Sequence, residues 1–254
     1  MADADTLAKQ AYSALREKLY LGQLPAGAQL VNRTLAAELG LSMTPVREAI
    51  NRLSSDGVVE FIHGAGAFVR RIEPRDLEQI YELRELLEPY AAAQAARLAS
   101  PVQLDELRQL CDEGDELAAE MQSKKRPRAD AAASLAAAWS DLEARFHGAV
   151  LHASNNRWLV GSVEGVRLLH RVSLAHQSLR EVLRSSETAT QTAREHRRLF
   201  EAIRDRKAPQ AERLMREHVT HGKEHVLARL QENRTASATR VRASQPGKQR
   251  GTAK

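Results

Sequence analysis

The sequence is poor in cysteine, in aromatic residues and in long apolar runs, and each scarcity excludes a class of protein. Its 254 residues include one cysteine, Cys111, so no disulfide framework can form within the chain, which fits a reducing cytoplasm. The apolar runs are far shorter than a membrane span, and the first residues lack the charged-then-apolar pattern of a signal peptide. We therefore expect a cytoplasmic protein without membrane segments.

The composition that remains favours a helical, folded protein. Hydrophobic residues make up 43% and charged residues 28%, which is enough to build a core, and the abundance of alanine favours helix. The formal net charge of +5 comes from the C-terminus, because Arg234 to Lys254 carry six basic residues and no acid, and 5 − 6 leaves −1 for the rest. We interpret residues 234–254 as a disordered basic tail that either solubilises the protein or makes non-specific contacts with phosphates.

The N-terminal part has the order of elements that is typical of a winged helix-turn-helix. Gly22, Gly40 and Gly57 follow helical patterns as stop signals, and a glycine-rich tip joins two β-type runs. The predicted elements are helices at about 6–21, 33–39 and 42–56, and strands at 58–62 and 67–70. Asn32 is the predicted N-cap of the short helix, and Ser42 or Thr44 that of the next. Helix, tight turn, helix and hairpin predict a DNA-binding head.

After Pro74 the strand signals vanish and six helices follow. Short loops between them predict that consecutive helices pack as antiparallel neighbours. Pro89 removes one backbone hydrogen bond inside the first of these helices and should kink it. A break is predicted at Ser185-Ser186. The predicted helices are 75–99, 102–123, 131–153, 157–184, 188–206 and 209–233.

Particular residues make this chain resemble a known family. In the head they are Gly22…Pro25-Ala26-Gly27, Leu35-Ala36…Leu39-Gly40, Thr44-Pro45-Val46-Arg47-Glu48-Ala49, Leu53…Gly57 and Gly66…Val69. In the helical part they are Glu82-Leu83-Arg84…Glu88, Arg145-Phe146-His147, Ala153-Ser154-Asn155-Asn156, Glu195-His196 and Met215-Arg216-Glu217-His218. The first set resembles the winged helix of the GntR family, and the second resembles the FCD (FadR-type) effector domain of that family. Six effector helices suggest its VanR-like branch.

The resemblance implies a mainly α protein with two domains. Residues 1–72 would be the winged helix-turn-helix, residues 73–233 an all-α antiparallel bundle of the FCD type, and residues 234–254 the tail. The implied function is a transcription regulator, by default a repressor, whose binding to double-stranded operator DNA is controlled by a small organic carboxylate. One winged helix covers a short half-site, so we expect a homodimer on a pseudo-palindromic operator.

An enzyme that uses a metal in the helical bundle is the alternative. The sequence has no Ser/His/Asp order, no glycine-rich phosphate loop and no His-Glu-x-x-His motif, and such an enzyme would leave the winged helix without a purpose. We therefore expect a regulator and not an enzyme.

Candidate DNA-reading residues lie on the two helices of the head and on the wing tip. Arginine contacts guanine bidentately, and recognition helices read bases near their N-termini. The resemblance places Arg33 and Arg47 at DNA-contacting positions of the family. Met43 stands where relatives often have arginine, so one base contact should be missing or replaced by apolar contact. The full set is Arg33, Thr44, Arg47, Arg52, His63 and Gly64.

Four residues of the helical part form a candidate metal site. Glu143 and His147 are four residues apart and share one helix face, and His196 and His218 lie on two later helices. The family carries histidines at the three histidine positions and an acid, usually Asp, at the position of Glu143. Such ligands suit zinc, with Mn, Ni and Fe as alternatives. A rival site made of His218, His221 and His225 stays open.

The predicted effector contacts are arginines, because an arginine binds a carboxylate bidentately. Arg84 matches a family position that faces the pocket. Arg167 and Arg171 are four apart on one helix and could also face inward, and Arg171 is included in the predicted effector site. Asn156 is predicted to cap the helix that starts at Arg157 and not to touch the ligand.

Overall fold

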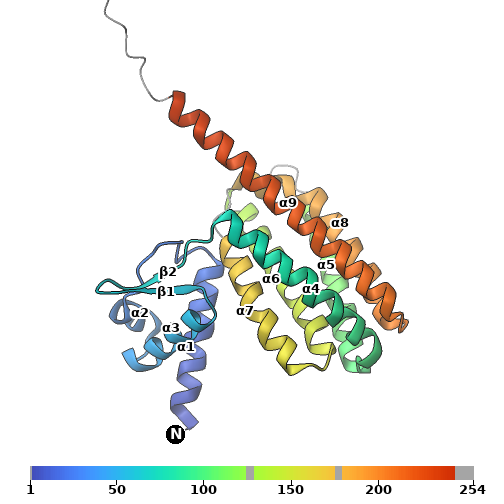
Figure 1. Cartoon of the computed structure of the whole chain (residues 1–254), viewed down its shortest axis with the longest axis horizontal. Helices are drawn as coiled ribbons and strands as arrows, with labels where there is room; N and C mark the ends of the chain where they lie inside the picture. Colours follow the sequence, from blue (N-terminus) through green and yellow to red (C-terminus); the bar gives the residue numbers. More distant parts are fainter. Residues whose placement is uncertain (1, 124–128, 175–178, 244–254) are drawn as a thin grey trace, which may run out of the picture.

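The computed structural model describes residues 2–123, 129–174 and 179–243 (Figure 1). Within them the chain is mainly helical, with one short antiparallel hairpin. No described helix is both long and apolar enough to cross a membrane. The elements are α1 Ala2–Tyr20, α2 Asn32–Leu39, α3 Met43–Ser55, β1 Val59–Ile62, β2 Gly66–Val69, α4 Pro74–Leu98, α5 Pro101–Ser123, α6 Ala129–Ala153, α7 Arg157–Leu174, α8 Leu179–Arg204 and α9 Ala208–Ala243.

The N-terminal elements form the predicted winged helix, with a core of its own. Leu15 and Leu19 of α1 pack against Val46, Ile50 and Leu53 of α3, all of them buried. The strands β1 and β2 pair in register from Val59↔Val69 to Ile62↔Gly66 and extend as a wing away from the helices (Figure 1). The apolar stripe of α3 therefore faces inward, and its opposite face is left to solvent.

The helix ends of the head agree with the sequence only in part. Gly40 follows α2 in the left-handed conformation (φ 65°), and Gly57 follows α3 with φ 80°, as the predicted stop signals require. The predicted cap Asn32 is wrong, because α2 already includes Asn32 and begins after Val31, whose carbonyl accepts from the Leu35 N–H. Ser42 does precede α3, but its side chain makes no capping hydrogen bond.

Six described helices, α4 to α9, build the second domain, and the boundaries of the last three differ from the prediction. The predicted break at Ser185-Ser186 is wrong, because both serines lie inside α8, which runs from Leu179 to Arg204. Serine disfavours helix by only a few tenths of a kcal/mol and keeps its backbone N–H, so two serines do not stop a helix.

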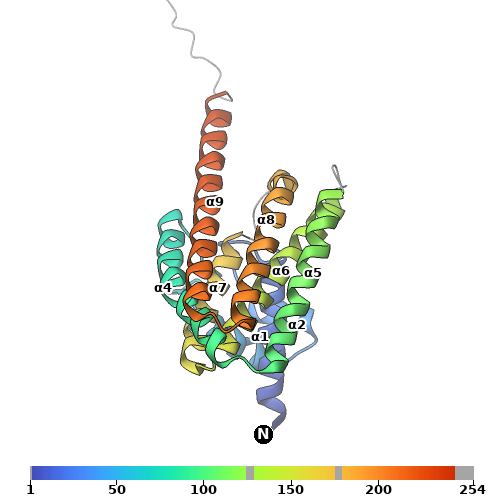
Figure 2. The same cartoon turned by 90° about the vertical axis from the view of Figure 1, so that its right-hand side faces the viewer.

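The last helix is also longer than predicted. Helix α9 continues to Ala243, which contradicts the predicted disorder of residues 234–243. These residues contain no glycine or proline, the first of which come at Pro246 and Gly247, so no such signal ends the helix earlier. The rest of the predicted tail, 244–254, lies outside the described residues. Figure 2 shows α9 extending well past its neighbours.

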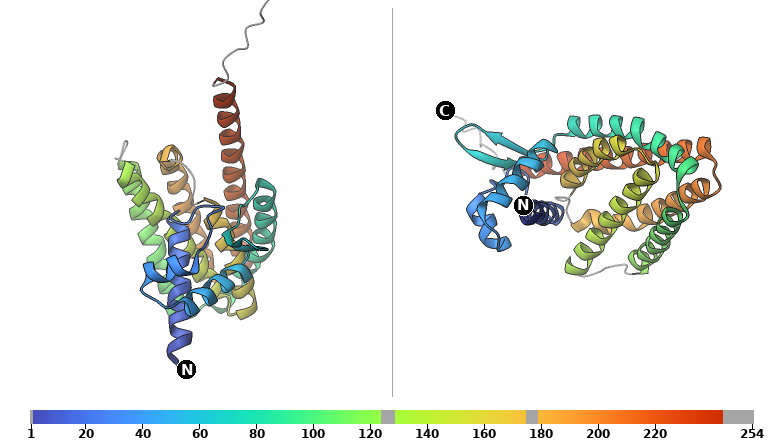
Figure 3. Two further views of the ribbon diagram at one scale, coloured as in Figure 1. Left: turned by 90° about the vertical axis from the view of Figure 1, so that its left-hand side faces the viewer. Right: turned by 90° about the horizontal axis from the view of Figure 1, so that it is seen from below.

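The packing of the second domain is only partly sequential. Helix α5 packs on α6 and α8 on α9, as the short loops predict, but α4 packs most extensively on α9, and α5 on α8. Loop length decides which helix ends meet, whereas the apolar faces decide which helices share a core. A large core cluster includes Leu107 of α5, Phe146 of α6, Ile203 of α8 and Met215 of α9. The view from below in Figure 3 shows the winged helix at one end of this bundle.

Side chains cap three helix starts in this domain, and at α5 the pair is Ser100 and Gln103, which bond to each other's backbone N–H. Helix α4 begins at Pro74, where Glu73 and Asp76 form a reciprocal capping box. Asn156 Oδ1 accepts the N–H groups of Trp158 and Leu159 at 3.1 Å each, which confirms Asn156 as the predicted cap of α7.

Candidate metal centre and DNA-reading surface

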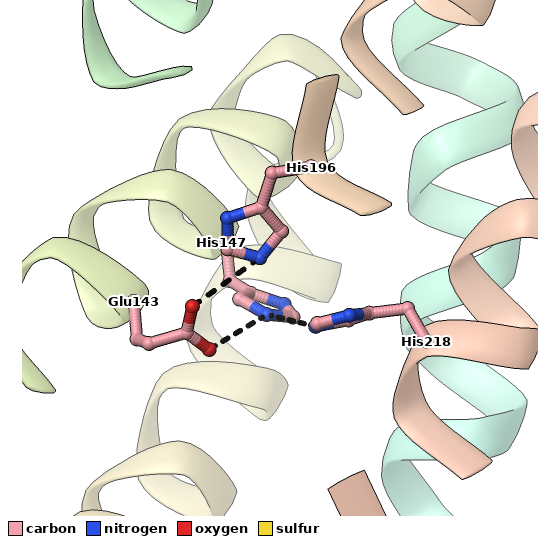
Figure 4. A group of neighbouring side chains, drawn as sticks. All are labelled: Glu143, His147, His196 and His218. Carbon is pink, nitrogen blue, oxygen red and sulfur yellow. Dashed lines mark hydrogen bonds and ion pairs between the residues drawn. The ribbon is translucent and has the colours of Figure 1, made fainter. Parts of the chain in front are cut away.

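The structure brings the four predicted metal ligands together (Figure 4). Glu143 and His147 come from α6, His196 from α8 and His218 from α9. One ligand atom of each lies within 4.8 Å of those of the other three. Because the i, i+4 spacing stacks Glu143 above His147 on one face of α6, the two later helices need to supply only one side chain each.

The distances between these atoms suit a bound cation. His147 Nε2 lies 3.0 Å from His218 Nε2, and Glu143 Oε1 lies 3.4 Å from His196 Nε2. Glu143 Oε2 lies 3.9 Å from His147 Nε2. Two ligand atoms held tetrahedrally at about 2.0–2.1 Å from one zinc ion are about 3.3 Å apart. The spacing of the four side chains is therefore close to what such a metal requires.

Carboxylates behind two histidines orient their rings. His147 Nδ1 lies 2.6 Å from Glu88 Oε2, and His218 Nδ1 lies 2.8 Å from Glu195 Oε2. A carboxylate accepts a hydrogen bond and cannot donate one, so each Nδ1 carries a proton, and in a neutral ring Nε2 presents a lone pair. When both rings are neutral, the two Nε2 atoms at 3.0 Å face each other as acceptors, an arrangement that a cation between them would stabilise.

Two buried polar atoms in the same cluster have no hydrogen-bond partner among the described residues. They are Glu143 Oε1 and His196 Nε2. The Glu143 side chain as a whole is 27% exposed, but this oxygen is buried. Buried polar atoms are nearly always satisfied, and leaving one unpaired costs about 1–3 kcal/mol. These atoms therefore fit a metal ligand set better than a set of core histidines.

Burial and neighbouring charges shift the pKa values of several groups in this cluster. Burial lowers the pKa of His196 well below its usual value, so this imidazole is neutral at pH 7. Burial raises the pKa of Glu143. Burial also opposes ionisation of Glu88, but the charges of Arg84 and Arg167 and the hydrogen bond from Arg84 together outweigh it and lower the pKa of Glu88. Partial burial raises the pKa of Glu195, but hydrogen bonds, first of all the one from His218, lower it further, and the pKa falls to about 2.

Arg84 lies near the four candidate metal ligands, but it already pairs with a carboxylate. It is buried, and its Nε donates to Glu88 Oε1 at 2.7 Å, while its guanidinium lies 4.9 Å from the Tyr81 ring. Arg84 therefore holds the carboxylate that orients His147. The side chain of Arg171 lies outside the described residues.

Arg167, which the sequence suggested together with Arg171 as an arginine that could face inward, does face inward. Its NH2 donates to the backbone oxygen of Glu143 at 3.2 Å, and its NH1 lies 3.7 Å from Glu88 Oε2. Its side chain is 11% exposed. The i, i+4 spacing of Arg167 and Arg171 signalled a shared face, but it could not show which interior that face meets.

Sequence reasoning assigned no role to Glu88 or Glu195. Glu88 was visible only as one residue of a family motif, and Glu195 only as the neighbour of His196. The rival site is not formed among the described residues: His221 is 46% exposed and binds Glu195 Oε1 at 3.0 Å, and His225 is exposed. His218 instead faces His147.

The candidate DNA-reading residues are exposed. Arg33 lies in the first turn of α2, and Thr44 and Arg47 lie near the start of α3. His63 and Gly64 form the exposed tip of the wing, where Gly64 has φ +74°. Arg52 differs, because it lies near the far end of α3 with its guanidinium 4.1 Å from the Tyr12 ring. A cation–π contact holds it against the head.

Comparison with known proteins matches both parts of the chain to family models. Residues 7–69 match the bacterial regulatory proteins of the gntR family, and residues 79–221 match the FCD domain. The chain belongs to the GntR family and carries an FCD domain. Among GntR-family relatives, the HTH-type transcriptional regulator YdhC of Bacillus subtilis is 26% identical over 89% of this chain and 93% of its own.

Two further comparisons agree. An HTH-type transcriptional regulator from the TAR-I ttuE-ttuC' intergenic region of Agrobacterium vitis is 31% identical over 54% of this chain and 74% of its own. The solved structure of McbR/YncC of Escherichia coli has a TM-score of 0.72 at 23% identity and covers 88% of this chain and 98% of its own, which shows the shared fold. The GntR winged helix and the FCD bundle expected from sequence are thus confirmed. The VanR-like branch stays a prediction.

Glu88 gives a test of the metal centre that spares the ligands. Glu88→Gln keeps the size of the side chain but weakens its hold on His147 Nδ1, and loss of such a partner typically lowers metal affinity about 10–100-fold. Isothermal titration of Zn²⁺ into metal-free protein measures this. Glu82→Gln, an exposed carboxylate of the same helix, is the matched control and should bind as wild type. Equal affinity of both variants would show that Glu88 does not support a metal.

Proposed function

We propose that this GntR-family regulator holds a divalent transition metal at Glu143, His147, His196 and His218, and that a small organic carboxylate bound beside the metal controls its affinity for operator DNA. The protein would act as a repressor that releases its operator when the effector binds. The observation that carries the proposal is the convergence of four ligand atoms from three helices within 4.8 Å, two of them buried without a hydrogen-bond partner.

The donor set narrows the choice of metal. Three imidazole nitrogens and one carboxylate suit zinc first, and Mn, Ni or Fe as alternatives. When bound, the metal would supply a Lewis-acid position for oxygen atoms of a ligand. The protein's own groups would do the remaining work: Glu88 and Glu195 fix the His147 and His218 rings, and Arg84 fixes Glu88.

The charge balance of the interior favours an anionic effector. The guanidinium groups of Arg84 and Arg167 balance the carboxylates of Glu88 and Glu143, and Glu195 adds one negative charge from its half-buried position. A divalent cation leaves this region with net positive charge, which an anion would compensate. Arg167 is the arginine better placed to meet it, because Arg84 is committed to Glu88 at 2.7 Å.

The metal and the effector can be tested together. Purified protein should contain about one divalent transition metal per chain, because the described residues form one set of four ligands. These ligands come from three helices, so the metal should also stabilise the bundle. The His147→Ala, His196→Ala double variant should lack this metal in elemental analysis. In a thermal-shift screen of organic acids, at least one acid should raise the midpoint of metal-loaded wild type and leave the double variant unchanged. Equal metal contents in both proteins would remove this site from the proposal.

DNA reading rests on the exposed start of α3. Arg47→Ala should abolish specific operator binding while helical content stays the same, because a bidentate guanine contact contributes about 1–3 kcal/mol of discrimination and a dimer loses it twice. Footprinting and gel shift on a duplex selected by the wild-type protein measure this. Arg213→Ala removes one exposed positive charge from α9 and is the matched control. Unchanged affinity of the Arg47→Ala protein would refute this docking.

A homodimer is proposed through the effector domain, which leaves both heads free for DNA. Leu83, Leu86 and Tyr90 follow one face of α4 and are 45%, 68% and 49% exposed. The start of α7, where Trp158 is 75% exposed, lies beside the end of α4, since Asn155 Nδ2 lies 3.5 Å from the Leu98 carbonyl. An apolar strip of this kind is typical of an interface between copies.

Substitution on this strip tests the dimer. Leu86→Glu introduces a charge at its centre and should convert the dimer to a monomer, as measured by light scattering at micromolar concentration. Val102→Glu changes an equally exposed apolar residue, 78% exposed at the start of α5, and should leave the dimer intact. A wild-type mass equal to one chain, with and without operator, would count against the dimer itself.

A further inference from the structure

Helix α7 belongs to both domains of the protein. Val166 packs against the large core of the effector domain, whereas Leu168, two residues later and 2% exposed, is part of the core of the winged helix. Leu169 packs against both cores. Helices α1 and α7 are in contact, and Figure 1 shows them meeting at their upper ends. The last turns of α7 therefore form part of the interior of the DNA-binding head, although they lie about 100 residues beyond it in the sequence.

The contact falls at the end of the helix that carries Arg47. Gly57 ends α3 with φ +80°, and a methyl group at its position would lie 3.5 Å from Leu169 Cδ1. On the next turn of α7, Gly165 approaches the backbone oxygen of Asp56 closely enough that a methyl group there would lie 4.0 Å from it. Asp56 in turn accepts a hydrogen bond from the Tyr12 hydroxyl of α1 at 2.6 Å. Thus α7 touches the C-terminal end of α3 and, through Asp56, the helix packed behind it.

The same turn of α7 enters the candidate metal centre. Arg167 NH2 donates to the Glu143 backbone oxygen at 3.2 Å, and Arg167 NH1 lies 3.7 Å from Glu88 Oε2. Glu143 is one of the four candidate ligands, and Glu88 orients another, His147. Residues 167, 168 and 169 are consecutive on one helix, so a backbone shift at Arg167 also shifts Leu168 and Leu169, which pack in and against the core of the head.

We propose that the last turns of α7 couple the metal centre to the recognition helix: Arg167 senses the occupied site, and Leu168 and Leu169 transmit its movement to the end of α3. This rests on the proposed function, because it requires a ligand at that centre. The sequence alone suggested a different element, α4, whose start directly follows the wing. The segment that leads into α4 is more exposed than the last turns of α7: Arg70, Arg71 and Glu73 lie on the surface, and only Ile72 packs, partly buried, against the core of the effector domain. Buried packing transmits a displacement, whereas an exposed connection absorbs it.

Coupling of this kind can be measured without knowledge of the effector, with Zn²⁺ alone as the probe. Hydrogen exchange of the full-length protein is followed with and without Zn²⁺, beside its Zn²⁺ affinity from titration calorimetry. In the wild type, Zn²⁺ should slow exchange in residues 165–169 and at the end of α3, residues 52–57, by about fivefold or more, the lower end of typical coupling between sites. In Leu169→Ala, Zn²⁺ affinity should stay within about twofold of wild type, and the slowing at residues 52–57 should disappear.

Leu159→Ala is the matched control. It is the same substitution on the same helix, but Leu159 packs against Ala91, Leu151 and Val163 inside the effector domain and away from the head. In this variant, Zn²⁺ should still slow hydrogen exchange at residues 52–57. If Leu169→Ala does not fold, the wild-type exchange map still decides: slowing at 70–76 without slowing at 165–169 and 52–57 would overturn the proposal in favour of α4.

The outcomes separate this inference from the function on which it rests. Zn²⁺ that binds and slows α3 equally in wild type and Leu169→Ala overturns the coupling through α7 and leaves the metal centre standing. If Zn²⁺ binds the wild type but does not slow hydrogen exchange at residues 52–57, the coupling is likewise overturned and the metal centre is left standing. A wild-type protein that binds no Zn²⁺ and carries no other metal overturns the proposed function, and the coupling with it.

Discussion

A group of ionisable side chains sits at the centre of a bundle that is otherwise packed with alanine, leucine and other apolar residues. Three imidazoles, of His147, His196 and His218, converge with Glu143, and Glu88 and Glu195 lie behind them. Burying such groups costs several kcal/mol for each one that is left uncompensated. The pairs Arg84–Glu88 and His218–Glu195 compensate most of this cost within the protein. Two features are left uncompensated: the facing Nε2 atoms of His147 and His218, and the atoms of Glu143 and His196 that make no hydrogen bond. A bound cation would compensate both.

The same cluster explains why the helices are arranged as they are. Helices α4, α6, α8 and α9 each contribute a polar side chain to one point, so these four must meet around it, whatever their order along the chain. Phe146 and His196 stack with ring centroids 3.8 Å apart, which joins the apolar core directly to the cluster. Helix α7 closes this interior with Arg167 and continues into the head with Leu168. Under the proposed function, regulation and folding would use one set of contacts, because the side chains that would bind a ligand also determine how the helices pack.

Much of this protein could be predicted from its sequence. The winged helix follows from local signals, because glycines with positive φ after α2 and α3 and a glycine-rich turn between two β-type runs need no distant partner. The i, i+4 pair Glu143 and His147 follows from helix geometry alone. The predictions that failed were also local ones, at Asn32, at Ser185-Ser186 and at the end of α9, where weak propensities were taken as firm boundaries. Helix ends are set by small energies that tertiary packing readily overrides.

By itself, the sequence determined the two domains in outline, the exposed arginine at the start of the recognition helix and the identity of the four candidate ligands. Only the tertiary structure decided the role of Arg84, which pairs with Glu88, and the role of Glu88, which meets a histidine 59 residues away. It also decided that Leu168 belongs to the core of the other domain. Periodicity states which side chains share a face of a helix, but it carries no information about which distant face they meet. That choice is made when all the apolar faces and buried charges are satisfied together.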